Sequence, residues 1–231
     1  MDQAKSDQAK RSIEIYQFHV VVRHTSPHIW RRLLVRSDIT IADLHQTIRI
    51  ALGWADSHPH RFLIRGKVYC GNPVDSGAVH QDPHPPRLAD FLFLPKERFL
   101  YEYDYPPGSG PGWQHQVRFE RTLPLEAGRF YPVCMGGVGT APPEHCSGPD
   151  GLAEFRELFT PRYILHRLAG ILDDGPTEQG IAELRHLRPW ITLHQFDRRR
   201  VNRQLQPAEP ASIGRGQGER NENPDPHYHP V

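Results

Sequence analysis

The chain has 231 residues, of which 37% are apolar and 24% are charged, which is enough to bury the core of one domain. Its formal net charge of +1 does not call for a nucleic acid or an anionic membrane as partner. No apolar stretch approaches the roughly 20 residues that span a bilayer, and the first residues lack the apolar segment of a secretory signal. Together with three cysteines, too few and odd for a disulfide framework, this predicts a cytoplasmic protein without membrane contact.

A strand-strand-helix-strand order is predicted for the first part of the chain. Residues 13–22 and 29–35 alternate apolar with polar side chains, and the turn residues between them favour an antiparallel pair. Thr40 is typical of a helix N-cap, and Asp43 stands three residues later, where it completes a capping box. Apolar residues at helical spacing follow, and residues 60–64 then alternate as a third strand.

An aromatic-rich hairpin comes next. Residues 101–105 alternate tyrosine with acidic residues, and a Gly/Pro-rich turn leads from them into residues 113–119, which are also rich in aromatic side chains. Before this hairpin, the Pro- and His-rich residues 72–86 are predicted to form a long surface loop, and residues 88–94 a short helix.

The second half of the chain has helical spacing. The segments with this spacing are residues 151–159, 162–172, 178–187 and 197–205. We therefore predict an α+β fold, with a mixed or antiparallel sheet first and helices following in the C-terminal half. The polar ends have little to bury, which predicts one domain and two disordered tails: residues 13–205, 1–12 and 206–231.

Aromatic and imidazole side chains recur in segments that should meet at one edge of the sheet. Large aromatic side chains with a few polar groups are the usual composition of a recognition site. We expect these residues to form a binding cluster: Trp30, Trp54, His58, His60, Tyr101, Tyr103, Asp104, Trp113 and His115.

Three of these histidines also have a metal interpretation. A strand that starts near His58 places His58 and His60 on one face, and His115 lies on the face of Trp113. Three neutral imidazoles can hold zinc with a fourth position open to water, although no Cys-x-x-Cys pair or His-Glu-x-x-His motif accompanies them. The other interpretation has no cofactor: the histidines hydrogen-bond to nearby carboxylates or carbonyls at the rim of the sheet.

Carboxylates and cysteines leave further alternatives open. Glu102 and Asp104 lie two apart on a strand and so face the same way, either as a pair for acid/base chemistry or on the solvent face of the hairpin. Cys134 and Cys146 flank a Gly/Pro-rich stretch that reads as a loop. This stretch lacks the closely spaced pairs of zinc ribbons, so thiols that cap a core are the simpler interpretation.

Two basic clusters raise the question of nucleic-acid binding. One runs from Trp30 to Arg32, and the other lies on the last predicted helix, where Arg199, Asn202 and Arg203 could meet phosphates. No helix-turn-helix, zinc finger or ribonucleoprotein signature accompanies them. A solvated helix face is the alternative.

Taken together, the motifs resemble one family along most of the chain. They occur in order at residues 29–35, 40–45, 53–58, 101–104, 113–115 and 142–148. They are similar to the plasmid-encoded ORF-three-like family, which is named from a root-inducing plasmid. The resemblance implies an α+β domain and an association with mobile elements, without an established reaction. Three positions depart from the family's pattern. The hairpin turn lacks an acidic residue after glycine, Ala141 stands where a cysteine is usual, and His145 stands where an aspartate is usual.

The aromatic and histidine framework favours a binding module over an enzyme. Our leading interpretation is a mobile-element-associated interaction or nucleic-acid-related domain without turnover, whose partner is a protein or a nucleic acid. The alternative is a metal-dependent hydrolase or nuclease that uses a His/Asp cluster.

Overall fold

The computed structural model describes residues 12–55, 58–70, 85–104, 112–146, 148–192 and 195–206. Nearly all of the predicted tails and of the predicted loop at residues 72–86 lie outside these ranges. The described strands are β1 (Glu14–Val22), β2 (Ile29–Arg36), β3 (His60–Ile64), β4 (Lys67–Cys70), β5 (Arg98–Tyr103), β6 (Trp113–Pro124) and β7 (Val133–Val138). The α-helices are α2 (Ile41–Leu52), α3 (Pro149–Leu158), α4 (Pro161–Asp174), α5 (Glu178–Ile191) and α6 (Arg198–Leu205).

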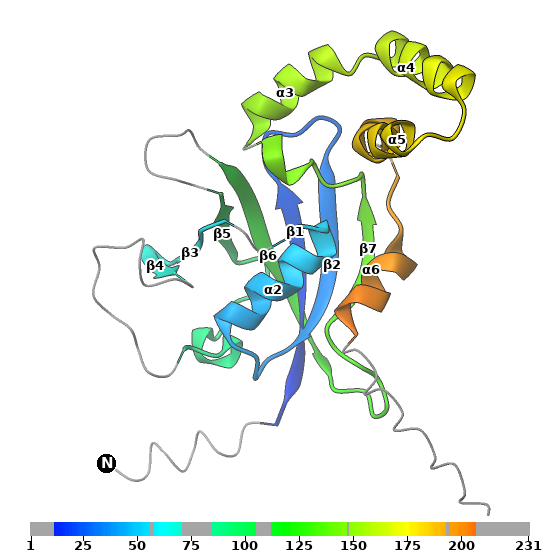
Figure 1. Ribbon diagram of the computed structural model, residues 1–231. Coiled ribbons are helices and arrows are strands. Elements are labelled where there is room, and N and C mark those ends of the chain that lie inside the picture. Colours follow the sequence, from blue (N-terminus) through cyan, green and yellow to red (C-terminus); the bar gives the residue numbers. More distant parts are fainter. Residues whose placement is uncertain are drawn as a thin grey trace, which may run out of the picture.

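The seven strands form one antiparallel sheet in the order β4-β3-β5-β6-β1-β2-β7 (Figure 1). The predicted α+β fold and its strand-strand-helix-strand opening are confirmed. The hairpin is also confirmed, with Tyr101 opposite His115 and Tyr103 opposite Trp113. The predicted short helix at residues 88–94 is only a single 3-10 turn, Leu88–Phe91.

Strands β4 and β7 were not predicted. Residues 133–138, expected to be loop, form β7, so that Cys134 lies in a strand and pairs with Leu33 of β2. The glycines at 136 and 137 interrupt the alternation of this strand, and its pairing comes from the backbone of β2. All three cysteines carry free thiols.

Helix α2 covers one face of the sheet, which we call the inner face. Its start follows the predicted capping box: the Thr40 side chain accepts a hydrogen bond from the Asp43 N–H, and the Asp43 carboxylate accepts one from the Thr40 N–H. Gly53 ends the helix in the left-handed conformation at φ 76°, which glycine adopts without a Cβ clash. That reversal turns Trp54 back toward the sheet.

Removal of this cap should weaken the fold modestly. We expect Thr40→Ala to lower the free energy of unfolding by about 1 kcal/mol, because the Asp43 N–H in the first turn loses its acceptor. Urea denaturation of both proteins would measure the difference. Thr122→Ala, at an exposed position of β6, is the matched control and should change stability by less than about 0.5 kcal/mol. Equal losses in both variants would contradict the role of the cap.

The core lies between α2 and the inner face. Its centre is a set of phenylalanines packed edge to face or stacked, with ring centroids 5.2 to 5.9 Å apart: Phe18, Phe93, Phe99 and Phe119. Each such pair stabilises the fold by about 0.5–1.5 kcal/mol beyond the contribution of its buried apolar area. The phenylalanines do not extend to the end of the sheet formed by β3, β5 and β6, where a different, more polar set of side chains lies.

Helix α6 covers the edge strand β7 beside α2. The side-chain amide of Asn202 imitates a strand: its oxygen accepts from the Cys134 N–H (2.7 Å) and its Nδ2 donates to the Cys134 carbonyl (3.0 Å). An edge strand that is paired in this way cannot recruit another chain at that residue.

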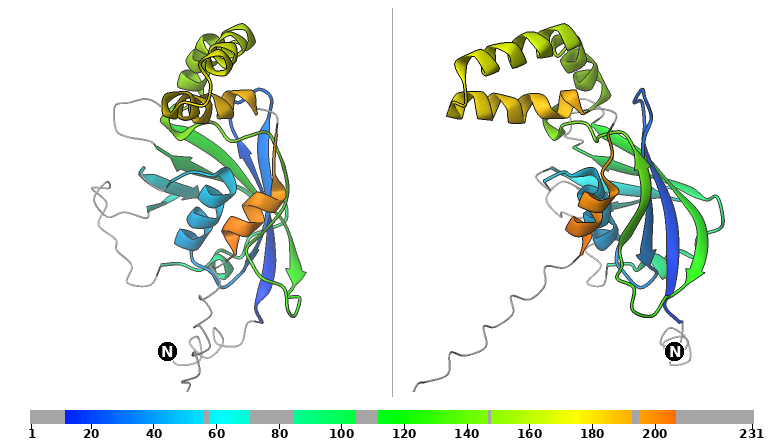
Figure 2. Two further views of the ribbon diagram at one scale, coloured as in Figure 1. Left: turned by 45° about the vertical axis from the view of Figure 1, so that its right-hand side comes forward. Right: turned by 90° about the vertical axis from the view of Figure 1, so that its right-hand side faces the viewer.

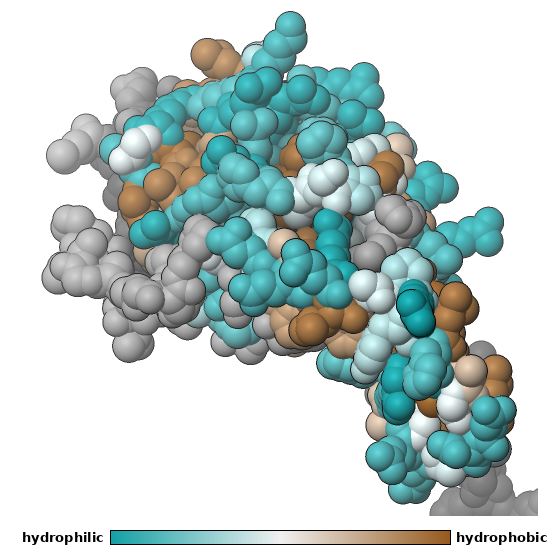
Figure 3. Space-filling model, turned by 90° about the horizontal axis from the view of Figure 1, so that it is seen from above, coloured by the Kyte–Doolittle hydropathy of each residue, from teal (hydrophilic) through white to brown (hydrophobic). Residues whose placement is uncertain are grey.

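Helices α3, α4 and α5 project as an arm from the end of the sheet (Figure 2). Several large apolar side chains of the arm are exposed, among them Leu158, Leu165 and Leu172. Seen from above, apolar side chains lie among polar ones on the projecting lobe (Figure 3). No helix in the described part of the chain is long and apolar enough to cross a membrane.

Candidate functional site

The sheet register gathers most of the predicted cluster at the inner face of β3, β5 and β6. Tyr103 stands between His60 of β3 and Trp113 of β6. The next inward pair along β5 and β6 is Tyr101 with His115. Because alternate residues of a strand point to the same side, these side chains share the inner face. The three aromatic rings and His115 are wholly buried.

Trp54 lies over this group. Its ring stacks on Tyr103 with centroids 4.9 Å apart, and it meets the rings of Trp113 at 5.9 Å and His115 at 5.3 Å. Its Nε1–H donates to the carbonyl of Pro142 (2.9 Å). The turn after α2 and the stretch after β7 are thereby held against the same sheet end.

Glu144 fastens that stretch a second time. Its carboxylate accepts a hydrogen bond from the Tyr103 hydroxyl and another from the Ala55 N–H (2.9 Å). Sequence reasoning did not place Glu144 in the site, although it belongs to one of the family-like motifs. The sequence signal for Glu144 was an acidic residue directly after two prolines. Its hydrogen-bond partners become apparent only in the fold.

His45 is a second residue that sequence reasoning missed. It lies on the buried face of α2, where its ring is parallel to that of His60 at 3.4 Å between centroids. Its Nδ1 forms a 2.8 Å hydrogen bond with the Tyr101 hydroxyl. His45 stands on the face of the helix that is otherwise apolar, and a polar residue at such a position was the sequence signal for a functional role.

His58 and Asp104 form the outer rim of the cluster. The two side chains meet at 3.1 Å between Nδ1 and Oδ1, with the imidazole one-third exposed and the carboxylate almost fully buried. Asp104 has φ 54°, a left-handed conformation in which Asp is tolerated better than most residues. Gly112 packs so closely that a Cβ there would come within 1.9 Å of the Asp104 carbonyl oxygen.

Three buried polar atoms of this sheet end have no hydrogen-bond partner among the described residues: Asp104 Oδ2, Trp113 Nε1 and His115 Nε2. Native proteins leave few such atoms, and each one calls for a ligand, a water or another explanation. Burial lowers the pKa of His115 to about 3, so its ring is neutral. Since a carbonyl only accepts, Nδ1–H donates to the Tyr101 carbonyl (3.2 Å), and Nε2 remains an acceptor.

The predicted metal trio is not formed. In the described residues no three His, Cys, Asp or Glu side chains are placed to hold one ion. His60 stacks on His45, His58 pairs with Asp104, and His115 turns its Nδ1 to a carbonyl. The strand begins at His60, so the period-two argument that aligned His58 with it does not apply.

Glu102 and Asp104 also separate. Glu102 receives hydrogen bonds from Arg61 and Gln114, whereas Asp104 follows the strand with positive φ and faces His58. Glu102 points to the face opposite Tyr101 and Tyr103, although it is almost fully buried there, and Asp104 does not share that arrangement.

Trp30 and Asn202 have other roles than predicted. Trp30 lies on the opposite, outer face of the sheet, 5.1 Å from the ring of His19, and so does not join the cluster. Both amide atoms of Asn202 bind the backbone of Cys134, so only Arg199 and Arg203 of the three predicted phosphate contacts are exposed.

The protein is of the α+β class, with one antiparallel sheet whose end is filled by tyrosine, tryptophan and imidazole rings. The chain belongs to the plasmid pRiA4b ORF-3-like family, whose profile matches residues 14–204. It is 31% identical over 152 residues to the uncharacterized protein y4hQ of Sinorhizobium fredii (strain NBRC 101917 / NGR234), covering 63% of this chain and 73% of that protein.

A solved structure has a similar fold. The crystal structure of MM3350, a protein of unknown function from Methanosarcina mazei Go1, matches with a TM-score of 0.56 and 27% sequence identity. The match covers 82% of this chain and 98% of that one. The resemblance stated from the sequence is confirmed.

Proposed function

We propose that the protein is a non-catalytic binding module whose ligand site is the sheet end around Asp104, Trp113 and His115. The observation that carries this proposal is the set of three buried polar atoms without partners in the described structure. Two are acceptors, Asp104 Oδ2 and His115 Nε2, and one is the Trp113 N–H donor. The complementary ligand is small, rich in N–H or O–H donors, and carries one acceptor.

Recognition fits this site better than turnover. The pKa of His115 lies near 3 because the ring is buried, so this imidazole neither takes nor releases a proton near neutral pH. The surrounding rings are fixed by stacking, with Trp54 on Tyr103 and His45 on His60. A preformed set of fixed polar groups between aromatic rings is the usual design of a binding site. The metal-dependent alternative would need a ligand group that the described residues do not form.

The proposed module comprises residues 13–205 and works in the cytoplasm, where its three free thiols stay reduced. The plasmid origin in the family's name supports a role beside a mobile element.

Asp104→Asn tests the site directly. Asn keeps the shape and tolerates positive φ, but it removes the charge that should receive the ligand's donor. We expect at least one of four probes, arginine, spermidine, cytosine or glucose, to raise the melting temperature of the wild-type protein. A probe at 100 times its Kd would add about 2.7 kcal/mol. The variant should need at least about tenfold more probe for the same shift.

Asp173→Asn, on the exposed face of α4, is the matched control and should respond like the wild type. A flat melting temperature with all four probes would contradict the proposed ligand chemistry. So would a shift that Asp104→Asn leaves unchanged.

A further inference from the structure

The outer face of the sheet, which points away from α2 and α6, has a separate pattern. Figure 2 (right) shows both helices on one side of the sheet. Two neighbouring rows of side chains cross the outer face from strand to strand in register. The first is mostly apolar: Leu63, Leu100, Gln116, Val21 and Trp30. The second, which we call the cationic row, holds three arginines and one neutral histidine: Arg98, Arg118, His19 and Arg32.

The cationic row places like charges side by side. Arg98 of β5 stands directly opposite Arg118 of β6, an arrangement that destabilises a sheet. Glu120 offsets part of the charge, since it accepts hydrogen bonds from Arg118 and Arg32, both at 2.8 Å. The Arg98 side chain is exposed and has no hydrogen-bond or ion-pair partner within the described residues. The row therefore keeps an excess of positive charge.

The pKa of His19 is lowered, chiefly by burial, so its ring is neutral near pH 7. Among the neighbouring charges, Glu120 raises this pKa, and Arg118 and Arg32 lower it. Over strands β1, β2, β3, β5 and β6 and the residues next to them, arginines outnumber carboxylates: Arg23, Arg31, Arg32, Arg36, Arg61, Arg65, Arg98, Arg118 and Arg121 stand against Glu14, Glu97, Glu102, Asp104 and Glu120. The near-zero net charge of the chain conceals this local excess.

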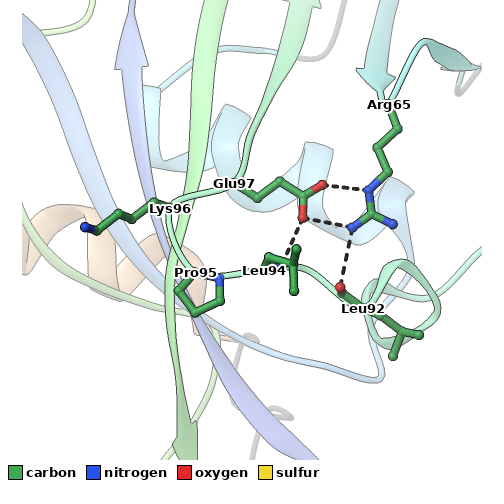
Figure 4. Close-up of a pocket in the computed structure, with 6 residues that line it drawn as sticks. All are labelled: Arg65, Leu92, Leu94, Pro95, Lys96 and Glu97. Atoms are coloured by element: carbon green, nitrogen blue, oxygen red, sulfur yellow. Dashed lines mark hydrogen bonds and ion pairs between the residues drawn. The ribbon is translucent and has the colours of Figure 1, made fainter.

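A depression of about 370 Å³ lies where the two rows meet β3, β5 and β6. Leu63 and Leu100 are among its apolar lining residues, and Arg23, Arg65 and Arg98 also line it. Arg65 also lines a neighbouring depression of about 660 Å³ together with Leu92 and Leu94 (Figure 4). There its guanidinium is already paired with Glu97, at 2.8 Å for both hydrogen bonds. Of the three arginines that line the first depression, Arg98 and Arg23 have no carboxylate partner among the described residues.

We propose that the outer face binds a single strand of nucleic acid, with bases over the apolar row and phosphates against the cationic row. An apolar or aromatic platform beside a basic track is how sheet proteins bind single strands. A duplex hides the faces of its bases and could use only the arginines. An acidic peptide would add to a sheet edge, and at β7 the side chain of Asn202 already pairs with that edge.

The test is fluorescence anisotropy with the full chain and a labelled oligothymidylate of about 16 nucleotides. That length is the upper end of the site sizes known for single-strand-binding OB-folds. Affinity should fall as salt rises from about 50 to 200 mM. The double variant Arg98→Ala/Arg118→Ala should bind about tenfold more weakly and lower the salt slope by about 1.4, which is two phosphate contacts. Trp30→Ala should weaken binding without a change in slope.

The matched control is Arg185→Ala/Arg188→Ala on the exposed side of α5, which removes the same charge and should bind like the wild type. An equal loss in the control would contradict a specific face, and a loss confined to Arg199→Ala/Arg203→Ala would move the site to α6. No binding at about 50 mM salt, or equal affinity for polyglutamate of the same charge, would also overturn the proposal. Binding by Asp104→Asn should be unchanged, which separates this surface from the ligand site.

Discussion

Arg31→Met is expected to lower the free energy of unfolding by about 3–5 kcal/mol, because a buried hub of hydrogen bonds disappears. Arg31 is only 3% exposed. Its guanidinium donates to the carbonyls of Trp30, Ala51, Val138 and Gly139 at 2.8 to 3.0 Å. It also lies 4.3 Å from the ring centroid of Phe196. One side chain thus joins β2, the C-terminal end of α2, the end of β7 and the segment before α6.

Burial lowers the pKa of Arg31 to about 10, so the guanidinium stays charged at neutral pH. Methionine fills the same space but leaves four carbonyls without that donor. Lysine keeps the charge and lacks the planar fork, so Arg31→Lys should recover less than half of the loss. Arg32→Met on the outer face is the control, with a loss near 1 kcal/mol or less. Urea denaturation would measure all three, and a loss below about 1 kcal/mol for Arg31→Met would refute the hub.

Stability should also fall in acid because of His115. The pKa of this ring is near 3 in the folded protein and about 6.5 when unfolded, so below pH 6.5 the unfolded chain binds a proton that the folded protein does not. Each pH unit from about 6.5 down to 3 should therefore cost about 1.4 kcal/mol from this group alone. Above pH 6.5 the contribution is constant.

Other groups titrate in the same range, so the comparison needs a variant. His115→Leu should lose this part of the acid dependence, and the difference between its stability curve and that of the wild type should grow by about 2.7 kcal/mol from pH 6.5 to 4.5. His28→Ala, at an exposed position, is the control and should follow the wild type. Parallel curves for His115→Leu and wild type, by denaturant unfolding at each pH, would show that the ring is protonated in the folded state.

Local signals in the sequence predicted the elements well. Thr40 and Asp43 form the predicted capping box, and Gly53 closes the helix because it reaches positive φ without strain. The alternation of residues 14–22 gave the buried face of β1 correctly. These features depend on residues within a few positions of each other, which is why one sequence suffices to find them.

What failed depends on partners far away in the chain. Cys134 lies in a strand because its backbone pairs with that of β2. Asn202, predicted to contact phosphate, instead hydrogen-bonds to the backbone of Cys134 as a neighbouring strand would. The side chain of Asp104 does not follow the alternation of β5, because the backbone at Asp104 has positive φ. Trp30 was grouped with the other aromatic residues, but the sheet register assigns it to the opposite face. Glu144 and His45 join the site only through tertiary packing.

The central claim is that His115 keeps a neutral ring with Nε2 open as an acceptor for a donor-rich ligand. Its direct test is the nitrogen-15 spectrum of the imidazole side chains, assigned with His115→Leu. We predict a proton on Nδ1 and none on Nε2 of His115 from pH 5 to 8, with the Nε2 signal moving when a binding probe is added. A proton on Nε2, or titration of this ring near pH 6.5, would contradict the account.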